Sequence, residues 1–173
     1  MKERLLQLFQ DRFGHRPTAF LELEADASTR RYSRLAGNDG ITAVGAMGPD
    51  REENRAFLTF AKAFRSIGLP VPEVYCEDQY AGVWLLEDLG DTTLFKFLTH
   101  ARAGLPEDQF PEEVEALYRK ALRVLPRFQV QGHEVADYDV AYPRRAFDQQ
   151  SMRWDLNYFK YHFLKLSHLP FNE

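Results

Sequence analysis

Residues 32–46 have the sequence YSRLAGNDGITAVGA, in which two short strand-like runs flank the turn Gly37-Asn38-Asp39-Gly40. Glycine and asparagine tolerate the positive φ that tight hairpin turns need. The stretch therefore predicts a hairpin of two strands, over 32–35 and 41–46. A further strand-like run over 19–23 precedes it, separated by a polar turn, so the beginning of the chain is predicted to be an antiparallel meander.

Helical patterns lie on both sides of this meander. Apolar residues at helical spacing predict a helix over 2–13, and Asp50 is a plausible N-cap for a second helix that Gly68 ends. Two more strands are predicted, over 73–76 and 82–87. From residue 92 onward the pattern is only helical, with helices expected over 114–128 and 151–167 and an irregular stretch over 132–149.

This order predicts the fold class. Five antiparallel strands with one helix after the third form an α+β arrangement, the layout of a protein-kinase-like N-lobe whose single helix corresponds to αC. The helices that follow would begin an α-helical C-lobe. The predicted division is therefore 1–90 for the N-lobe and 91–173 for the start of the C-lobe.

Composition narrows the function classes. The 173 residues carry a net charge of −4 and a single cysteine, Cys76. Nucleic-acid binders usually have a basic excess, and one cysteine makes no internal disulfide. The N-terminus lacks the apolar core of a signal peptide, and no run approaches a membrane span. We expect a cytoplasmic protein with no nucleic-acid or membrane partner.

Four segments, in order along the chain, carry a resemblance to a known family. They are residues 26–35 (DASTRRYSRL), 53–57 (ENRAF), 68–72 (GLPVP) and 85–91 (LLEDLGD). The set resembles the aminoglycoside phosphotransferase-like kinases of bacteria, and within them the branch of N-acetylmuramate and N-acetylglucosamine kinases. The resemblance implies ATP and Mg²⁺ as cofactors and a small hydroxyl compound, a sugar or amino sugar, as phosphate acceptor.

The first segment would cover the phosphates of the nucleotide. The small residues Ala27, Ser28 and Thr29 would let backbone N–H groups approach the phosphates, and hydroxyl groups would add donors. Arg30, Arg31 and Arg34 would supply positive charge. The alternative is a solvated hairpin tip with surface arginines.

Glu53 lies where the αC glutamate of a kinase pairs with a strand lysine that holds the phosphates. The strand over 41–47 contains no lysine. Our hypothesis is that Arg30 or Arg34 replaces it and pairs with Glu53. The alternative for Glu53 is an acid that favours the helix dipole.

The resemblance implies that residues 85–91 form the hinge that binds the adenine base. Leu85 would face the base, and Glu87 and Leu89 would contribute to its binding, mostly through the backbone. A plain strand-to-helix turn is the alternative.

The catalytic loop of the family is not found in these residues. It requires an Asp five residues before an Asn, and none of the four asparagines has one. We therefore predict no catalytic residue and no metal ligand in this chain, and expect the Mg²⁺ ligands beyond residue 173, in a longer kinase. The alternative function is a non-catalytic nucleotide-sensing or protein-interaction module. In the kinase interpretation, the exposed apolar helices of the truncated lobe would favour self-association.

Overall fold

The computed structural model describes residues 2–24, 29–38, 40–106 and 109–167. Its strands are β1 (Ala19–Leu23), β2 (Arg31–Ala36), β3 (Thr42–Met47), β4 (Val74–Asp78) and β5 (Val83–Glu87). Its α-helices are α1 (Lys2–Phe13), α2 (Arg51–Ser66), α3 (Leu94–Ala101), α4 (Glu112–Val135) and α5 (Gln149–Phe159). A 3₁₀ turn, η1 (Tyr138–Val140), follows α4, and a π-helical turn, η2 (Lys160–Leu164), continues α5.

The strands form one antiparallel sheet in the order β1-β2-β3-β5-β4. In its centre, Val44 of β3 lies between Arg34 of β2 and Leu86 of β5. The predicted α+β class and the five-stranded antiparallel sheet are confirmed. The protein-kinase-like assignment of this sheet stays a prediction.

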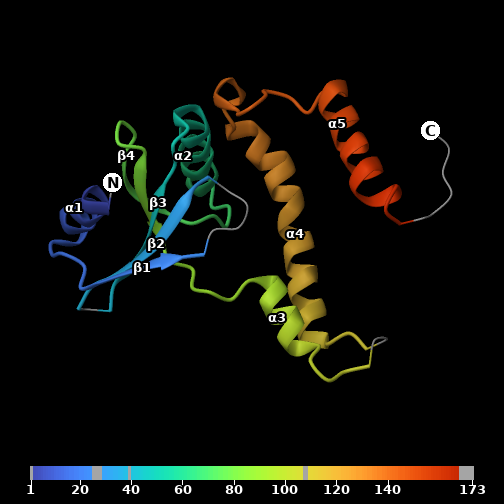
Figure 1. Cartoon of the computed structure of the whole chain (residues 1–173), viewed down its shortest axis with the longest axis horizontal. Coiled ribbons are helices and arrows are strands. Elements are labelled where there is room, and N and C mark those ends of the chain that lie inside the picture. The colour runs from blue at the N-terminus through green and yellow to red at the C-terminus, as the bar shows by residue number, and fades with distance from the viewer. Residues whose placement is uncertain (1, 25–28, 39, 107–108, 168–173) are drawn as a thin grey trace.

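Strand alternation gives the sheet two faces with different covers. Leu35 and Leu85 point to one face and are fully buried against Leu5 and Phe9 of α1. On the other face Trp84 of β5 and its neighbours pack against α2. Figure 1 shows α1 and α2 beside the sheet, with the later helices to one side.

The start of α2 is fixed by a close approach between backbones. Gly48 donates its N–H to the carbonyl of Gly82 (3.0 Å), and its own carbonyl accepts a hydrogen bond from the buried Asn54 amide (2.8 Å). A Cβ on Gly48 would collide with the Asn54 side chain. Asp50 then caps the helix, as predicted, by accepting from the backbone N–H groups of Glu52 and Glu53.

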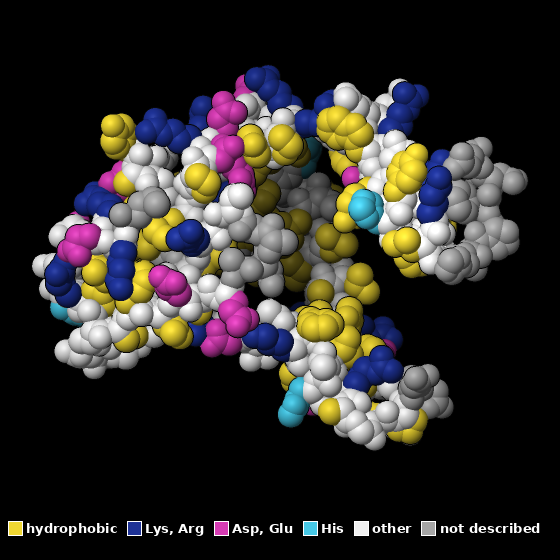
Figure 2. Space-filling model, in the orientation of Figure 1, with side chains coloured by type: hydrophobic (Ala, Val, Ile, Leu, Met, Phe, Trp, Pro, Cys, Tyr) yellow, Lys and Arg dark blue, Asp and Glu magenta, His cyan; other side chains and the backbone are white. Residues whose placement is uncertain are grey.

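The helical part differs from expectation in two places. Helix α4 extends to Val135, so the irregular stretch begins later than 132. The predicted helix over 151–167 is α-helical only to Phe159, after which five residues take a π-helical turn. Figure 2 shows hydrophobic side chains on the surface of this part, around a hollow between the sheet and α5. Leu122 of α4 and Tyr158 of α5 are among the exposed ones.

Candidate functional site

Arg30 precedes β2 and forms an ion pair with α2. Its Nη2 lies 3.0 Å from Glu53 Oε1 and 3.2 Å from the backbone oxygen of the same residue. The guanidinium also lies over the rings of Phe57 (4.9 Å) and Trp84 (5.6 Å), and the Arg30 side chain is only 11% exposed. The two cation–π contacts and the Glu53 carboxylate together stabilise the charge of the Arg30 guanidinium at this mostly buried position.

The pair answers one question that the sequence left open. Of the two arginines proposed to replace the strand lysine, Arg30 is the one that contacts Glu53. The neighbouring strand position on the same face is Ala46, which is fully buried and small. The arginine therefore reaches α2 from β2, across a strand that presents no charge there.

Arg34 lies at the other end of β2 and has a different role. Its Nε and Nη2 donate to the two carboxylate oxygens of Asp88 (2.6 and 3.0 Å), and Nη1 and Nη2 donate to those of Asp91 (2.7 and 2.9 Å). The hydrogen bonds that Arg34 donates to Asp91, and then those to Asp88, raise the pKa of Arg34 above its ordinary value. Both carboxylates belong to the linker after β5, so Arg34 ties the sheet to that linker and does not pair with Glu53.

Leu85, which is predicted to face the adenine base, lies on the opposite face of the sheet from Arg30. It is fully buried in the cluster beneath α1, whereas Arg30 lies among residues of the α2 face. Its neighbour Leu86, 6% exposed, and Trp84 point to the α2 face. Residues 83–86 are apolar at every position, so only the strand register shows which of them share a face with Arg30.

The remaining predicted site residues lie apart from Arg30. Glu87 accepts a hydrogen bond from the backbone N–H of Glu73 (3.0 Å) and lies 3.5 Å from Arg65, so its side chain links the residue before β4 to α2. Leu89 is exposed in the linker, and Thr29 is exposed beside the start of β2. Ser28 lies outside the described residues.

The α2 face of the first strands is open and mixed in character. Leu21 of β1 lies opposite Arg34 and is 59% exposed, and Val44 of β3 flanks Arg34 on its other side. Arg30 and Arg34 are four residues apart along an extended segment, or about 13 Å at the usual strand rise. The face therefore offers an apolar surface near the linker and a cation at its far end.

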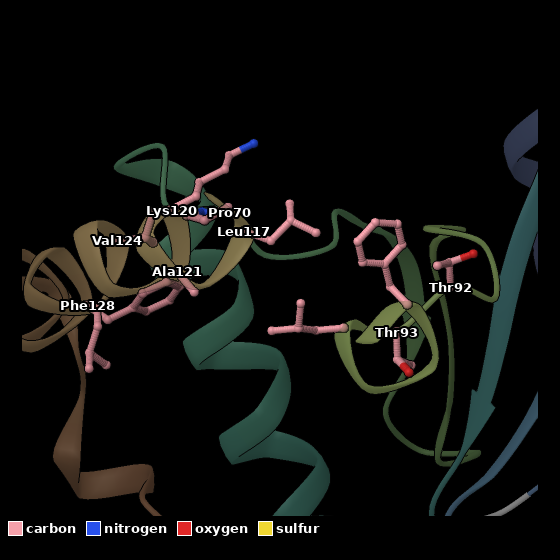
Figure 3. A pocket seen from close by; sticks show the side chains of 11 residues that line it. Pro70, Thr92, Thr93, Leu117, Lys120, Ala121, Val124 and Phe128 are labelled. Carbon is pink, nitrogen blue, oxygen red and sulfur yellow. The ribbon is translucent and has the colours of Figure 1, made fainter. Parts of the chain in front are cut away.

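A separate apolar cavity of about 610 Å³ lies between α3, α4 and Pro70. Figure 3 shows Leu117, Ala121 and Phe128 of α4 around it, with Thr92 and Thr93 on the side of α3. Lys120 is its only charged lining residue. This lining suits a nonpolar group and not a phosphate.

Two kinds of feature are absent from the described part of the chain. No group of three or more His, Cys, Asp or Glu side chains is placed to hold a metal ion there. Among the same residues, no helix has the length and apolar character needed to span a membrane.

Comparison with known proteins finds two similar kinases. The chain is 30% identical over 143 residues to an N-acetylmuramate/N-acetylglucosamine kinase of Pseudomonas aeruginosa, which covers 83% of the chain and 37% of that protein. It is also 30% identical over 121 residues to a protein of the same name from Pseudomonas putida, covering 69% of the chain and 35% of the relative.

The chain thus spans little more than a third of the length of the curated relatives it matches. No family model matches it. The two similarities support the sugar-kinase branch of the resemblance, while membership of the wider aminoglycoside phosphotransferase-like family stays a prediction.

Proposed function

We propose that this chain is the ATP-binding portion of a kinase that phosphorylates an alcohol group of a sugar or amino sugar. The observation that carries the proposal is the Arg30–Glu53 ion pair on the open face of the sheet. The similarity to the two sugar kinases supports the same reading. In this proposal residues 1–90 bind the nucleotide, and residues 91–173 begin the lobe that carries the acceptor.

The residues on the α2 face of the sheet have different roles in nucleotide binding. Arg30 donates to the phosphates, and Glu53 holds the guanidinium in place, as the lysine–glutamate pair does in kinases. Leu21 and Val44 pack against the base, whose edge meets the backbone of the linker at Leu89. Arg34 is occupied by Asp88 and Asp91, so it orients the linker instead of binding phosphate. Magnesium, when bound, would neutralise part of the phosphate charge.

Replacing Arg30 by Met is expected to weaken ATP binding by about ten-fold or more, because a charge-assisted hydrogen bond contributes roughly 1.5–3 kcal/mol. Adenosine, which has no phosphate, should bind both proteins equally. Isothermal titration calorimetry with ATP and adenosine measures both affinities on the same preparations.

The matched control for this variant is Arg31→Met. Arg31 is the adjacent residue, is exposed, and has no ion-pair partner among the described residues. We expect its ATP affinity to stay within two-fold of the parent chain. Equal ATP affinity of Arg30→Met and the parent chain would contradict the proposed role of Arg30.

The chain alone is expected to bind nucleotide without turning it over, because no Asp precedes an Asn at the catalytic-loop spacing. ADP release should equal the blank when ATP, Mg²⁺ and N-acetylmuramate or N-acetylglucosamine are supplied. The Pseudomonas aeruginosa relative is the positive control in the same coupled assay. Sustained ADP release dependent on the sugar would refute this expectation.

The missing strand lysine and the missing catalytic loop favour a second candidate function, a non-catalytic nucleotide-sensing or protein-interaction module.

A further inference from the structure

A tyrosine from the helical part reaches the cap of α2. The segment after α4 turns back beside α2 (Figure 1), and the hydroxyl of Tyr142 donates to Asp50 Oδ2 at 2.8 Å. The other oxygen of the same carboxylate, Oδ1, accepts from the N–H groups of Glu52 (2.9 Å) and Glu53 (3.0 Å). One carboxylate therefore joins Tyr142 to the first turn of α2, across 92 residues of sequence.

We propose that Tyr142 is a positioning residue for the Arg30–Glu53 pair, acting through Asp50. The coupling between Tyr142 and the pair stands on geometry alone. Its consequence for nucleotide binding rests on the proposed function of that pair.

Helix α2 is held to the helical part at two ends by different means. At its C-terminal end Phe64 packs edge-on against Phe128 of α4 (5.6 Å), and Arg127 donates to the carbonyl of Gly68 (3.3 Å). These contacts join the C-terminal end of α2 to α4, about four helical turns from Glu53. Tyr142 fixes the N-terminal end to the same part of the molecule.

The contact at the N-terminal end is polar and not a packed interface. A cavity of about 280 Å³ lies beside it, lined by Glu52 and Arg55 of α2 and by Asp139 and Arg145 of the facing segment, among others. The Tyr142–Asp50 hydrogen bond joins the two sides next to this cavity. These hydrogen bonds shift the pKa values of both groups. The bond from the Glu53 N–H, and then the bond from Tyr142, lowers the pKa of Asp50. The same bond to Asp50 raises the pKa of Tyr142.

The sheet also holds the first turn of α2, through the Asn54–Gly48 hydrogen bond. Loss of Tyr142 should therefore shift the turn without unfolding it. Glu53 lies in that turn and carries the partner oxygen of Arg30, whose guanidinium lies over Trp84. A movement of Glu53 thus changes the surroundings of the Trp84 indole.

The test compares Tyr142→Phe with Tyr138→Phe, both made together with Trp154→Phe so that Trp84 is the only tryptophan. Tyr138 lies in the same segment, but its hydroxyl forms a hydrogen bond with His133 Nδ1 (2.9 Å) and not with a residue of the α2 cap. Because the bonds from Glu52 and Glu53 to Asp50 remain, loss of the Tyr142 hydroxyl should loosen the turn only in part, and we expect about five-fold faster amide exchange at these two residues by NMR in Tyr142→Phe. Trp84 emission should change in the same variant. Equal exchange and emission in the two variants would overturn the inference.

Nucleotide binding then tests the consequence. Tyr142→Phe should bind ATP about five-fold more weakly and adenosine unchanged, and it should add no further loss in the Arg30→Met background. An unchanged ATP affinity, in a parent chain that does bind ATP, would overturn the positioning role in binding. If the parent chain binds no ATP while amide exchange and Trp84 emission still respond to Tyr142→Phe, the proposed function fails and the positioning of the pair is supported.

Discussion

Replacing Leu85 by Ala is expected to lower the free energy of unfolding by about 3 kcal/mol, the usual cost of a large-to-small change in a core. Leu85 is fully buried among side chains of α1 and the sheet. It lies on the face away from Arg30, so the affinity of the folded variant for ATP should not change. Urea unfolding followed by circular dichroism gives the first quantity, and calorimetry with ATP gives the second.

Leu89→Ala is the matched control, because it removes the same atoms from a linker residue that is 68% exposed. Its free energy of unfolding should stay within about 0.5 kcal/mol of the parent chain, as for most surface substitutions. A stable Leu85→Ala protein with weakened ATP binding would reverse the assignment and return Leu85 to the nucleotide site.

Replacing Arg34 by Met is expected to lower the free energy of unfolding by about 2 kcal/mol at pH 7, because removal of one partner leaves a buried charge uncompensated. The Asp88 side chain is only 6% exposed and loses both hydrogen bonds from the guanidinium. Since these bonds tie β2 to the linker, the variant should also loosen the connection between the sheet and the helices. Urea unfolding at several pH values measures the loss.

The pH dependence of this effect has a definite sign. Burial by itself raises the pKa of Asp88, but hydrogen bonds from Arg34 and Gly90 outweigh it and lower the pKa below 3.8. A carboxyl group with a lowered folded-state pKa stabilises the fold above its unfolded pKa and loses this contribution as the pH falls through the folded pKa. The difference between the parent chain and Arg34→Met should therefore shrink between about pH 5 and pH 3.

Arg31→Met again serves as control, because no carboxylate among the described residues pairs with it. Its stability should follow that of the parent chain at each pH. A stability difference for Arg34→Met that is as large at pH 3 as at pH 7 would show that the carboxylates are not its origin.

The two arginines illustrate how much of the site a sequence can specify. The sequence predicts both near phosphate, since arginines in a hairpin of small residues are typical of phosphate sites. Sequence spacing places Arg30 and Arg34 on one face of the strand, but it does not say which carboxylates meet them. Asp88 and Asp91 come from a linker more than fifty positions later, and Glu53 comes from a helix. These partners make Arg30 a candidate phosphate ligand, whereas Arg34 connects β2 to the linker after β5.

Leu85 shows the same limit at the level of a strand. The run Val83-Trp84-Leu85-Leu86 is apolar at every position because helices cover both faces of the sheet. Such a run predicts a buried strand but not which residues share a face with a distant arginine. The contact between Tyr142 and Asp50 had no local signal at all.

The sequence by itself determined the order and type of the elements, the antiparallel meander and the cap at Asp50, because turns, caps and periodicity are local properties of the chain. It also indicated the resemblance to sugar kinases, which the two similar proteins support. Only the tertiary structure decided that Arg30 meets Glu53, that Arg34 holds the linker and that Tyr142 reaches α2. These pairings depend on strand register and on the packing of helices against the sheet, which bring together residues that no local pattern connects.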